Sequence, residues 1–101
     1  MLKKQFLKTK DVCKVSFSLP EAVQGETVYL VGDFNKWDES ATQMKRQKNG
    51  SFTVTLDLEK DHEYQFRYLV NGSEWHNEWE ADKYVPNPYS GDNSVVVTYQ
   101  T

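Results

Sequence analysis

One stretch of the sequence, residues 63–77, constrains the fold more than any other. Its first half alternates aromatic or β-branched side chains with other residues, as in a strand with one face on a core. One face carries Tyr64, Phe66, Tyr68 and Val70, and the other carries Glu63, Gln65, Arg67 and Leu69. Asn71-Gly72 follows, and this dipeptide is a strong hairpin signal because both residues tolerate positive φ. The stretch therefore predicts an antiparallel hairpin.

The length of the hairpin loop decides where Trp75 lies. With Asn71-Gly72 alone in the loop, Val70 pairs with Ser73, and Trp75 stands opposite Tyr68 on the core face. If Ser73 joins the loop, Trp75 stands opposite Leu69 on the face of Arg67. A slip of one residue moves a side chain through the sheet. The dipeptide by itself favours the two-residue loop, and thus a buried Trp75.

The rest of the chain reads as short strands separated by turn residues. Residues 78–92 contain two prolines, which exclude a helix, and are expected to be irregular. Residues 44–50 are expected to be a polar loop that turns at Asn49-Gly50. Such spacing is typical of an antiparallel sandwich or barrel. The strands expected outside the hairpin are residues 12–19, 27–31, 51–58 and 93–100.

Length indicates a single domain, and the cysteine content is compatible with a reducing compartment. The 101 residues are enough for one core without staples. A single cysteine, Cys13, allows no intramolecular disulfide. No apolar run resembles a signal peptide or could span a bilayer, so we expect a cytoplasmic protein without membrane contact. Residues 1–10 are expected to be a tail or an added edge strand, and residues 11–101 the folded domain.

Charge and motif content argue against a nucleic-acid partner and against catalysis. The net charge is −3, whereas a nucleic-acid binder would show a basic surplus. His62 and His76 do not form a metal-ligand spacing with Cys13, and no catalytic triad or phosphate-binding loop is recognisable. Glu78, Glu80 and Asp82 are expected to form a solvated acidic loop rather than the acid pair of a glycosidase. We therefore expect no catalytic residues, no metal and no cofactor.

Aromatic residues are more informative about binding. They make up 14% of the chain, more than a small sandwich core needs. Trp37, Trp75 and Trp79 all fall in turns, loops or short strands. An indole on a firm β scaffold offers a flat apolar surface for a pyranose ring, while nearby amides and a cation bind the hydroxyls. With Arg67 and several asparagines, these tryptophans favour a shallow carbohydrate site.

Four segments carry a family resemblance that covers about residues 12–99. They are Val28-Tyr-Leu-Val-Gly-Asp-Phe-Asn-Lys-Trp37, Phe66-Arg-Tyr-Leu-Val-Asn-Gly72 with Trp75 after it, Val85-Pro-Asn-Pro-Tyr89, and Asp92-Asn-Ser-Val-Val96. Together they resemble the family 48 carbohydrate-binding module, the glycogen-binding type found in glycogen branching enzymes and the AMP-activated protein kinase β subunit. The resemblance implies an all-β, immunoglobulin-like (early-set) antiparallel β-sandwich.

The resemblance also implies a binding site for α-1,4-linked glucan. The two stacking tryptophans of the family match Trp37 and Trp75, its lysine falls on Arg67, and its asparagine matches Asn93. A further contact residue falls near Tyr89. The family's hairpin is one residue shorter before the second tryptophan. The resemblance therefore favours the three-residue loop here, with Trp75 beside Arg67.

Three interpretations follow from these observations. The first is a non-catalytic module that binds glycogen, starch or maltooligosaccharides. The alternative is a protein-interaction or regulatory module of the same fold, associated with a glycoside hydrolase family 13 enzyme, in which Trp79 and the acidic run at residues 78–82 contact the partner. In the third, the chain is the N-terminal module of such an enzyme. At 101 residues it lacks the roughly 250 residues of a catalytic barrel.

Overall fold

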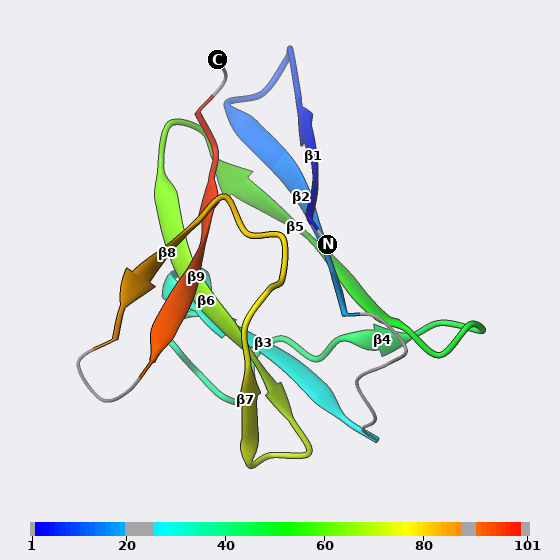
Figure 1. The fold of residues 1–101 in the computed structure, drawn as a ribbon. Helices are drawn as coiled ribbons and strands as arrows, with labels where there is room; N and C mark the ends of the chain where they lie inside the picture. The colour runs from blue at the N-terminus through cyan, green and yellow to red at the C-terminus, as the bar shows by residue number, and fades with distance from the viewer. Residues whose placement is uncertain (1, 20–25, 88–90, 100–101) are drawn as a thin grey trace.

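The computed structural model describes residues 2–19, 26–87 and 91–99. Two antiparallel sheets pack face to face in it, which confirms the expected all-β sandwich (Figure 1). The first sheet has the strand order β1-β2-β5-β4. Its strands are β1 (Leu2–Phe6), β2 (Val12–Leu19), β4 (Lys45–Arg46) and β5 (Phe52–Glu59).

The second sheet contains the stretch that organises the sequence. Its order is β3-β6-β9-β8, and β7 pairs with β6 beside this path. The short 3-10 helix η1 (Asp33–Asn35) follows its first strand. The strands are β3 (Val28–Gly32), β6 (Glu63–Val70), β7 (Glu74–His76), β8 (Lys83–Pro86) and β9 (Asp92–Val97).

The core lies between the sheets and follows the alternation of the sequence. Phe66, Tyr68 and Val70 of β6 are fully buried there, as the pattern predicts. Phe17 from the opposite sheet packs edge-to-face on Phe66, with ring centroids 5.1 Å apart. Such aromatic pairs contribute about 0.5–1.5 kcal/mol beyond the area they bury. Leu2 and Phe6 of the edge strand β1 pack against the same core.

The hairpin between β6 and β7 has a three-residue loop. Val70 pairs with Glu74 and Leu69 with Trp75, so Ser73 belongs to the loop. Asn71 and Gly72 take positive φ angles of 54° and 75°. The two-residue loop favoured by the dipeptide alone is therefore wrong. The three-residue loop favoured by the family resemblance is confirmed.

Two segments expected to be irregular contain short strands. Lys83–Pro86 forms β8, which pairs only with β9 among the described strands. Proline is tolerated there because an edge strand leaves one row of donors unpaired. Lys45–Arg46 forms β4, paired with the start of β5. The turn expected at Asn49-Gly50 is present, and Gly50 has a φ of 89°.

The expectation of a solvated acidic loop at residues 78–82 is wrong for Glu78. This side chain is 2% exposed, and its carboxylate accepts hydrogen bonds from the Tyr68 hydroxyl at 2.9 Å and the Glu80 amide at 2.9 Å. These donors compensate for removing the carboxylate from water. Asp82 also has partners, namely Lys4 at 2.6 Å and the amide of Val97 at 2.8 Å. Glu80 and Asp82 remain exposed, as expected, so among these three acidic residues only Glu78 belongs to the packed interior.

Candidate functional site

The candidate site is built on the face of β6 that points away from the core. Because Phe66 and Tyr68 point inward, Gln65, Arg67 and Leu69 lie on the outer face of the second sheet. The register places Val31 of β3 beside Arg67 and Trp75 of β7 beside Leu69. A rigid central strand therefore carries Arg67, with neighbours on both sides.

Arg67 and Trp75 are in contact. The guanidinium carbon lies over the indole, 5.9 Å from the ring centroid, at the distance of a cation–π interaction. The indole remains 39% exposed. The Arg67 Nε is buried and has no hydrogen-bond partner among the described residues. Within the part of the chain that the structure describes, Arg67 packs against the ring and makes no ion pair, and the Arg67–Trp75 contact is the most prominent feature of the face.

Asn93 lies on the same face but is engaged with its neighbours. Its side-chain nitrogen donates to Gln65 Oε1 at 3.0 Å, and its oxygen accepts from the Asn87 side chain at 3.0 Å. The residue is 6% exposed. These bonds fix the orientation of the Gln65 amide, two residues from Arg67. Asn93 therefore lies on this face and also holds the Gln65 side chain in place there.

Trp37 is held in one orientation just after η1. Its backbone amide donates to the Gly32 carbonyl at 2.8 Å, and its indole Nε1 donates to Asp33 Oδ1 at 2.8 Å. The other oxygen of Asp33 accepts the backbone N–H of Gln65 at 2.8 Å. Trp37 has a positive φ of 58°, which is uncommon outside glycine and is associated with functional sites. The half-buried indole is thus tied to β6 through Asp33.

The structure describes four of the five site residues expected from the sequence. Arg67 lies on β6, and Trp75 and Asn93 lie on the strands that pair with it. Trp37 is linked to β6 only through Asp33. Tyr89, the fifth, lies outside the described residues. Asp33 and Gln65 were not predicted as site residues. The alternation of β6 already places Gln65 on the face of Arg67 and could have identified it. No sequence pattern indicated that the Asp33 carboxylate bridges Trp37 and the β6 backbone.

No group of three His, Cys, Asp or Glu side chains within residues 2–19, 26–87 and 91–99 is arranged to hold a metal ion. In the same part of the chain, no helix has the length and apolar character needed to cross a bilayer.

Comparison with known proteins identifies the family of this chain. Residues 13–99 match the family model described as the glycogen recognition site of AMP-activated protein kinase. A segment of 58 residues, 57% of this chain, is 35% identical to the 1,4-alpha-glucan branching enzyme GlgB of Butyrivibrio fibrisolvens. The chain matches only 9% of that enzyme's length. Because the family model covers most of the chain, the protein belongs to the family of glycogen recognition modules typified by that of AMP-activated protein kinase.

Proposed function

We propose that this protein is a non-catalytic module that binds α-1,4-linked glucan on the outer face of β6. The observation that carries the proposal is the contact between Arg67 and the exposed Trp75. The C–H face of a glucose ring would stack on the indole, because both surfaces are flat and apolar. The guanidinium beside the ring would donate hydrogen bonds to the sugar hydroxyls.

The remaining site residues extend this surface along β6. Trp37 would stack a second glucose ring, with its orientation kept by Asp33. Asn93 would donate the second N–H of its amide, and Gln65 would contribute the amide that Asn93 orients. Tyr89 would add a contact next to Asn93. This assignment is supported by membership in the glycogen recognition family and by the branching-enzyme relative.

The relative also suggests an enzyme partner. A module that binds α-glucan would hold a glycan-active enzyme, encoded with it or docked on it, near its polymeric substrate. We further propose a cytoplasmic location. The single cysteine, Cys13, is free and buried, which is compatible with a reducing compartment. No cofactor is needed for this function.

Isothermal titration calorimetry with maltoheptaose tests the glucan site. A shallow surface that stacks two rings should bind in the sub-millimolar range, about −5 kcal/mol, because little area is desolvated. Trp75→Ala and Trp37→Ala should each weaken binding about tenfold or more through loss of a stacking surface. Tyr99→Ala is the matched control, since Tyr99 is also exposed (44%) but lies at the opposite end of β6, bonded to Glu63.

Two results would contradict the proposal. One is a wild-type protein that gives no heat with maltoheptaose and stays in the supernatant when glycogen is sedimented. The other is glucan binding that Trp75→Ala leaves unchanged. If the wild type fails to bind glucan yet recovers a glycoside hydrolase family 13 enzyme in a pull-down, the alternative of a protein-interaction module with this fold replaces it.

A further inference from the structure

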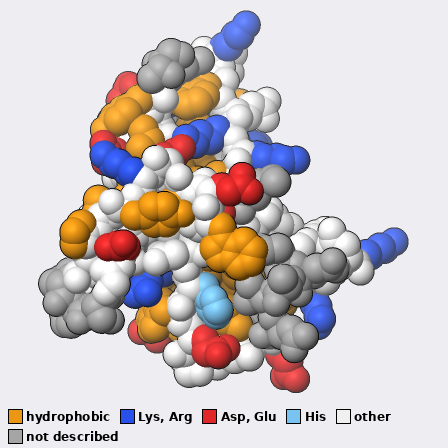
Figure 2. Space-filling view, viewed as in Figure 1, with side chains coloured by type: hydrophobic (Ala, Val, Ile, Leu, Met, Phe, Trp, Pro, Cys, Tyr) orange, Lys and Arg blue, Asp and Glu red, His pale blue; other side chains and the backbone are white. Residues whose placement is uncertain are grey.

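Trp79 is an exposed tryptophan that the proposed glucan site does not use. Its side chain is 65% exposed, more than that of Trp75 (39%) or Tyr84 (45%). Figure 2 shows exposed apolar side chains next to acidic ones over the connection between β7 and β8. An indole this exposed in a small domain leaves apolar area in water, which is a common feature of binding surfaces.

The backbone that carries Trp79 is firmly held. On one side, the Glu78 amide donates to the Ser94 hydroxyl at 2.8 Å, and the Glu78 carbonyl accepts from the Tyr84 hydroxyl. On the other side, the Glu80 amide donates to the buried Glu78 carboxylate at 2.9 Å. The exposed ring is therefore presented by a fixed segment and not by a free loop. A pre-organised platform loses little conformational entropy on binding.

Trp79 and Trp75 belong to two different surfaces of the domain. Trp75 stands beside Leu69 and contacts Arg67, on the outer face. By contrast, the residue before Trp79 binds Tyr68 and Ser94, whose side chains point toward the core. Trp79 itself lines a pocket with Ser18 and Leu19 of the first sheet, and Trp75 is not among the described lining residues. The two indoles cannot contribute to one flat surface.

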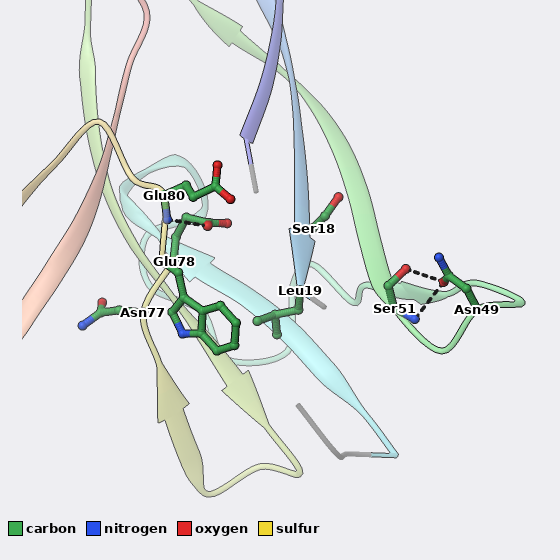
Figure 3. A pocket seen from close by; sticks show the side chains of 8 residues that line it. Ser18, Leu19, Asn49, Ser51, Asn77, Glu78 and Glu80 are labelled. Carbon is green, nitrogen blue, oxygen red and sulfur yellow. Dashed lines mark hydrogen bonds between the residues drawn. The ribbon is translucent and has the colours of Figure 1, made fainter. Parts of the chain in front are cut away.

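Trp79 borders a pocket of about 430 Å³ at the end of the sandwich (Figure 3). Glu78 and Leu19 extend into the space between the β7–β8 connection and the end of β2, while Asn77 points away toward β9. Asn49 and Ser51 border it from the turn before β5. Its described lining residues are Ser18, Leu19, Asn49, Ser51, Asn77, Glu78, Trp79 and Glu80.

The chemistry of this lining selects one class of ligand. One wall carries the polar side chains of Ser18, Ser51 and Asn49, where Asn49 Oδ1 accepts from the Ser51 hydroxyl, and the other carries the indole of Trp79 and the Glu80 carboxylate. No lysine or arginine is among the described lining residues, so an anion such as phosphate would be repelled by the Glu80 carboxylate without a cationic side chain there to offset it. A neutral ring with many hydroxyls fits both walls, since it can stack on the indole and donate to the carboxylate and amide oxygens.

We propose that the Trp79 pocket is a second saccharide site, separate from the Arg67–Trp75 face. The pocket volume lies within the range of small-molecule sites, roughly 300–1,000 Å³. It is bounded by both sheets, so it would take a short saccharide or a chain end, whereas the outer face takes the length of a chain. The inference that this pocket binds a saccharide is based on its lining residues. Only the choice of an α-glucan as that saccharide rests on the proposed function.

Nuclear magnetic resonance of the full chain tests this proposal. Each tryptophan gives its own indole N–H signal, assigned with Trp37→Ala, Trp75→Ala and Trp79→Ala variants. Maltose and maltoheptaose are titrated into each ¹⁵N-labelled protein. We expect the Trp79 signal to shift with a dependence on sugar concentration that differs from that of the Trp75 signal. The Trp79 shift should be the same in Trp75→Ala as in the wild type. Glu80→Gln, which keeps the backbone bond to Glu78, should weaken this binding about fivefold, and Tyr99→Ala should leave it unchanged.

The outcomes separate the two sites. A shift at Trp79 without one at Trp75 would support the pocket and count against the outer face. A shift at Trp75 while Trp79 stays unmoved by both sugars would overturn the pocket as a saccharide site. If the sugars leave Trp79 unmoved but an arginine-rich peptide shifts it, the platform recognises a cationic protein segment, and the saccharide proposal is equally overturned.

Discussion

Gly32 shows how closely β3 approaches β6 behind the candidate site. Its backbone is extended, with φ −174°, so no left-handed conformation requires glycine here. Space requires it instead, since a Cβ atom would lie 2.5 Å from the Gln65 carbonyl oxygen and 2.8 Å from the Phe66 Cβ. Both contacts are with atoms that cannot rotate away. The Asp33 and Trp37 contacts to β6 depend on this close approach.

Gly32→Ala should destabilise the protein by about 1–3 kcal/mol, the usual cost of overpacking. The cause is that β3 must move away from Gln65 and Phe66. Urea unfolding followed by tryptophan fluorescence measures the effect. Ser73→Ala, in the exposed hairpin loop, is the control and should change stability by less than about 0.5 kcal/mol. A variant as stable as the wild type would mean that the two strands can separate freely at this point.

At the scale of elements, the β6–β7 hairpin determines which side of the sheet Trp75 occupies. Deleting Ser73 leaves Asn71-Gly72 as a two-residue loop and still pairs Val70 with Glu74. We therefore expect the deletion to keep Trp75 beside Arg67 and to keep glucan binding within about threefold. Deleting both Ser73 and Glu74 would instead pair Val70 with Trp75 and turn the indole toward the core side.

Fluorescence and calorimetry distinguish these hairpin variants. The single deletion should retain the emission maximum and the maltoheptaose heat of the wild type, and the double deletion should lose the heat. Loss of binding in the single deletion would show that the third loop residue itself is needed to orient Trp75.

The connection between β7 and β8 depends on the buried pair of Tyr68 and Glu78. The Tyr68 hydroxyl donates to the Glu78 carboxylate at 2.9 Å, and both side chains are buried. Tyr68→Phe leaves a buried carboxylate with one donor fewer, so we expect a loss of about 1–3 kcal/mol in the free energy of unfolding. Tyr64→Phe is the control, because its hydroxyl makes only a longer bond, 3.3 Å, at the exposed edge.

The pH dependence of stability provides a second readout for this pair. Burial, together with the negative charge of Glu78, raises the pKa of Tyr68 above its ordinary value of 10.0. The unfolded chain therefore releases this proton before the folded chain does. The contribution of Tyr68 to stability is complete below pH 10.0 and is lost as the pH rises beyond it. This alkaline loss should be smaller in Tyr68→Phe; an unchanged slope would place the titration elsewhere.

For the molecule as a whole, the reactivity of the Cys13 thiol reports how often the single core opens. The thiol is fully buried on β2, and burial raises its pKa above 9.0. Because only the thiolate reacts, native protein should label with a disulfide reagent at least about a hundredfold more slowly than protein in urea. The rate should rise in Gly32→Ala and Tyr68→Phe by about tenfold for each 1.4 kcal/mol of lost stability, because labelling follows the population of the open form. Rapid labelling of the native wild type would show that β2 opens locally.

The faces of the strands could be predicted from the sequence because a strand has a local period of two. The side chains of β2, β5 and β6 predict the core residues, and the structure places them there. The resemblance to the glycogen recognition family identified Arg67 and Trp75 as neighbours. Residues 83–86 were missed as a strand, since their pairing with β9 is a contact between segments that no local pattern indicates.

The alternation that builds two sheets around one core is written in the sequence, because each strand's two faces are set by neighbouring residues. Only the tertiary structure decided where the connections between strands go. The burial of Glu78 depends on Tyr68 and Ser94, which lie 10 and 16 residues away in the chain. The same bonds fix the segment that carries Trp79, which lines a pocket with Leu19 of the first sheet and not the Arg67–Trp75 face. A hydrogen bond between distant residues has no signature in either residue's own surroundings in the sequence, and so this placement required the folded chain.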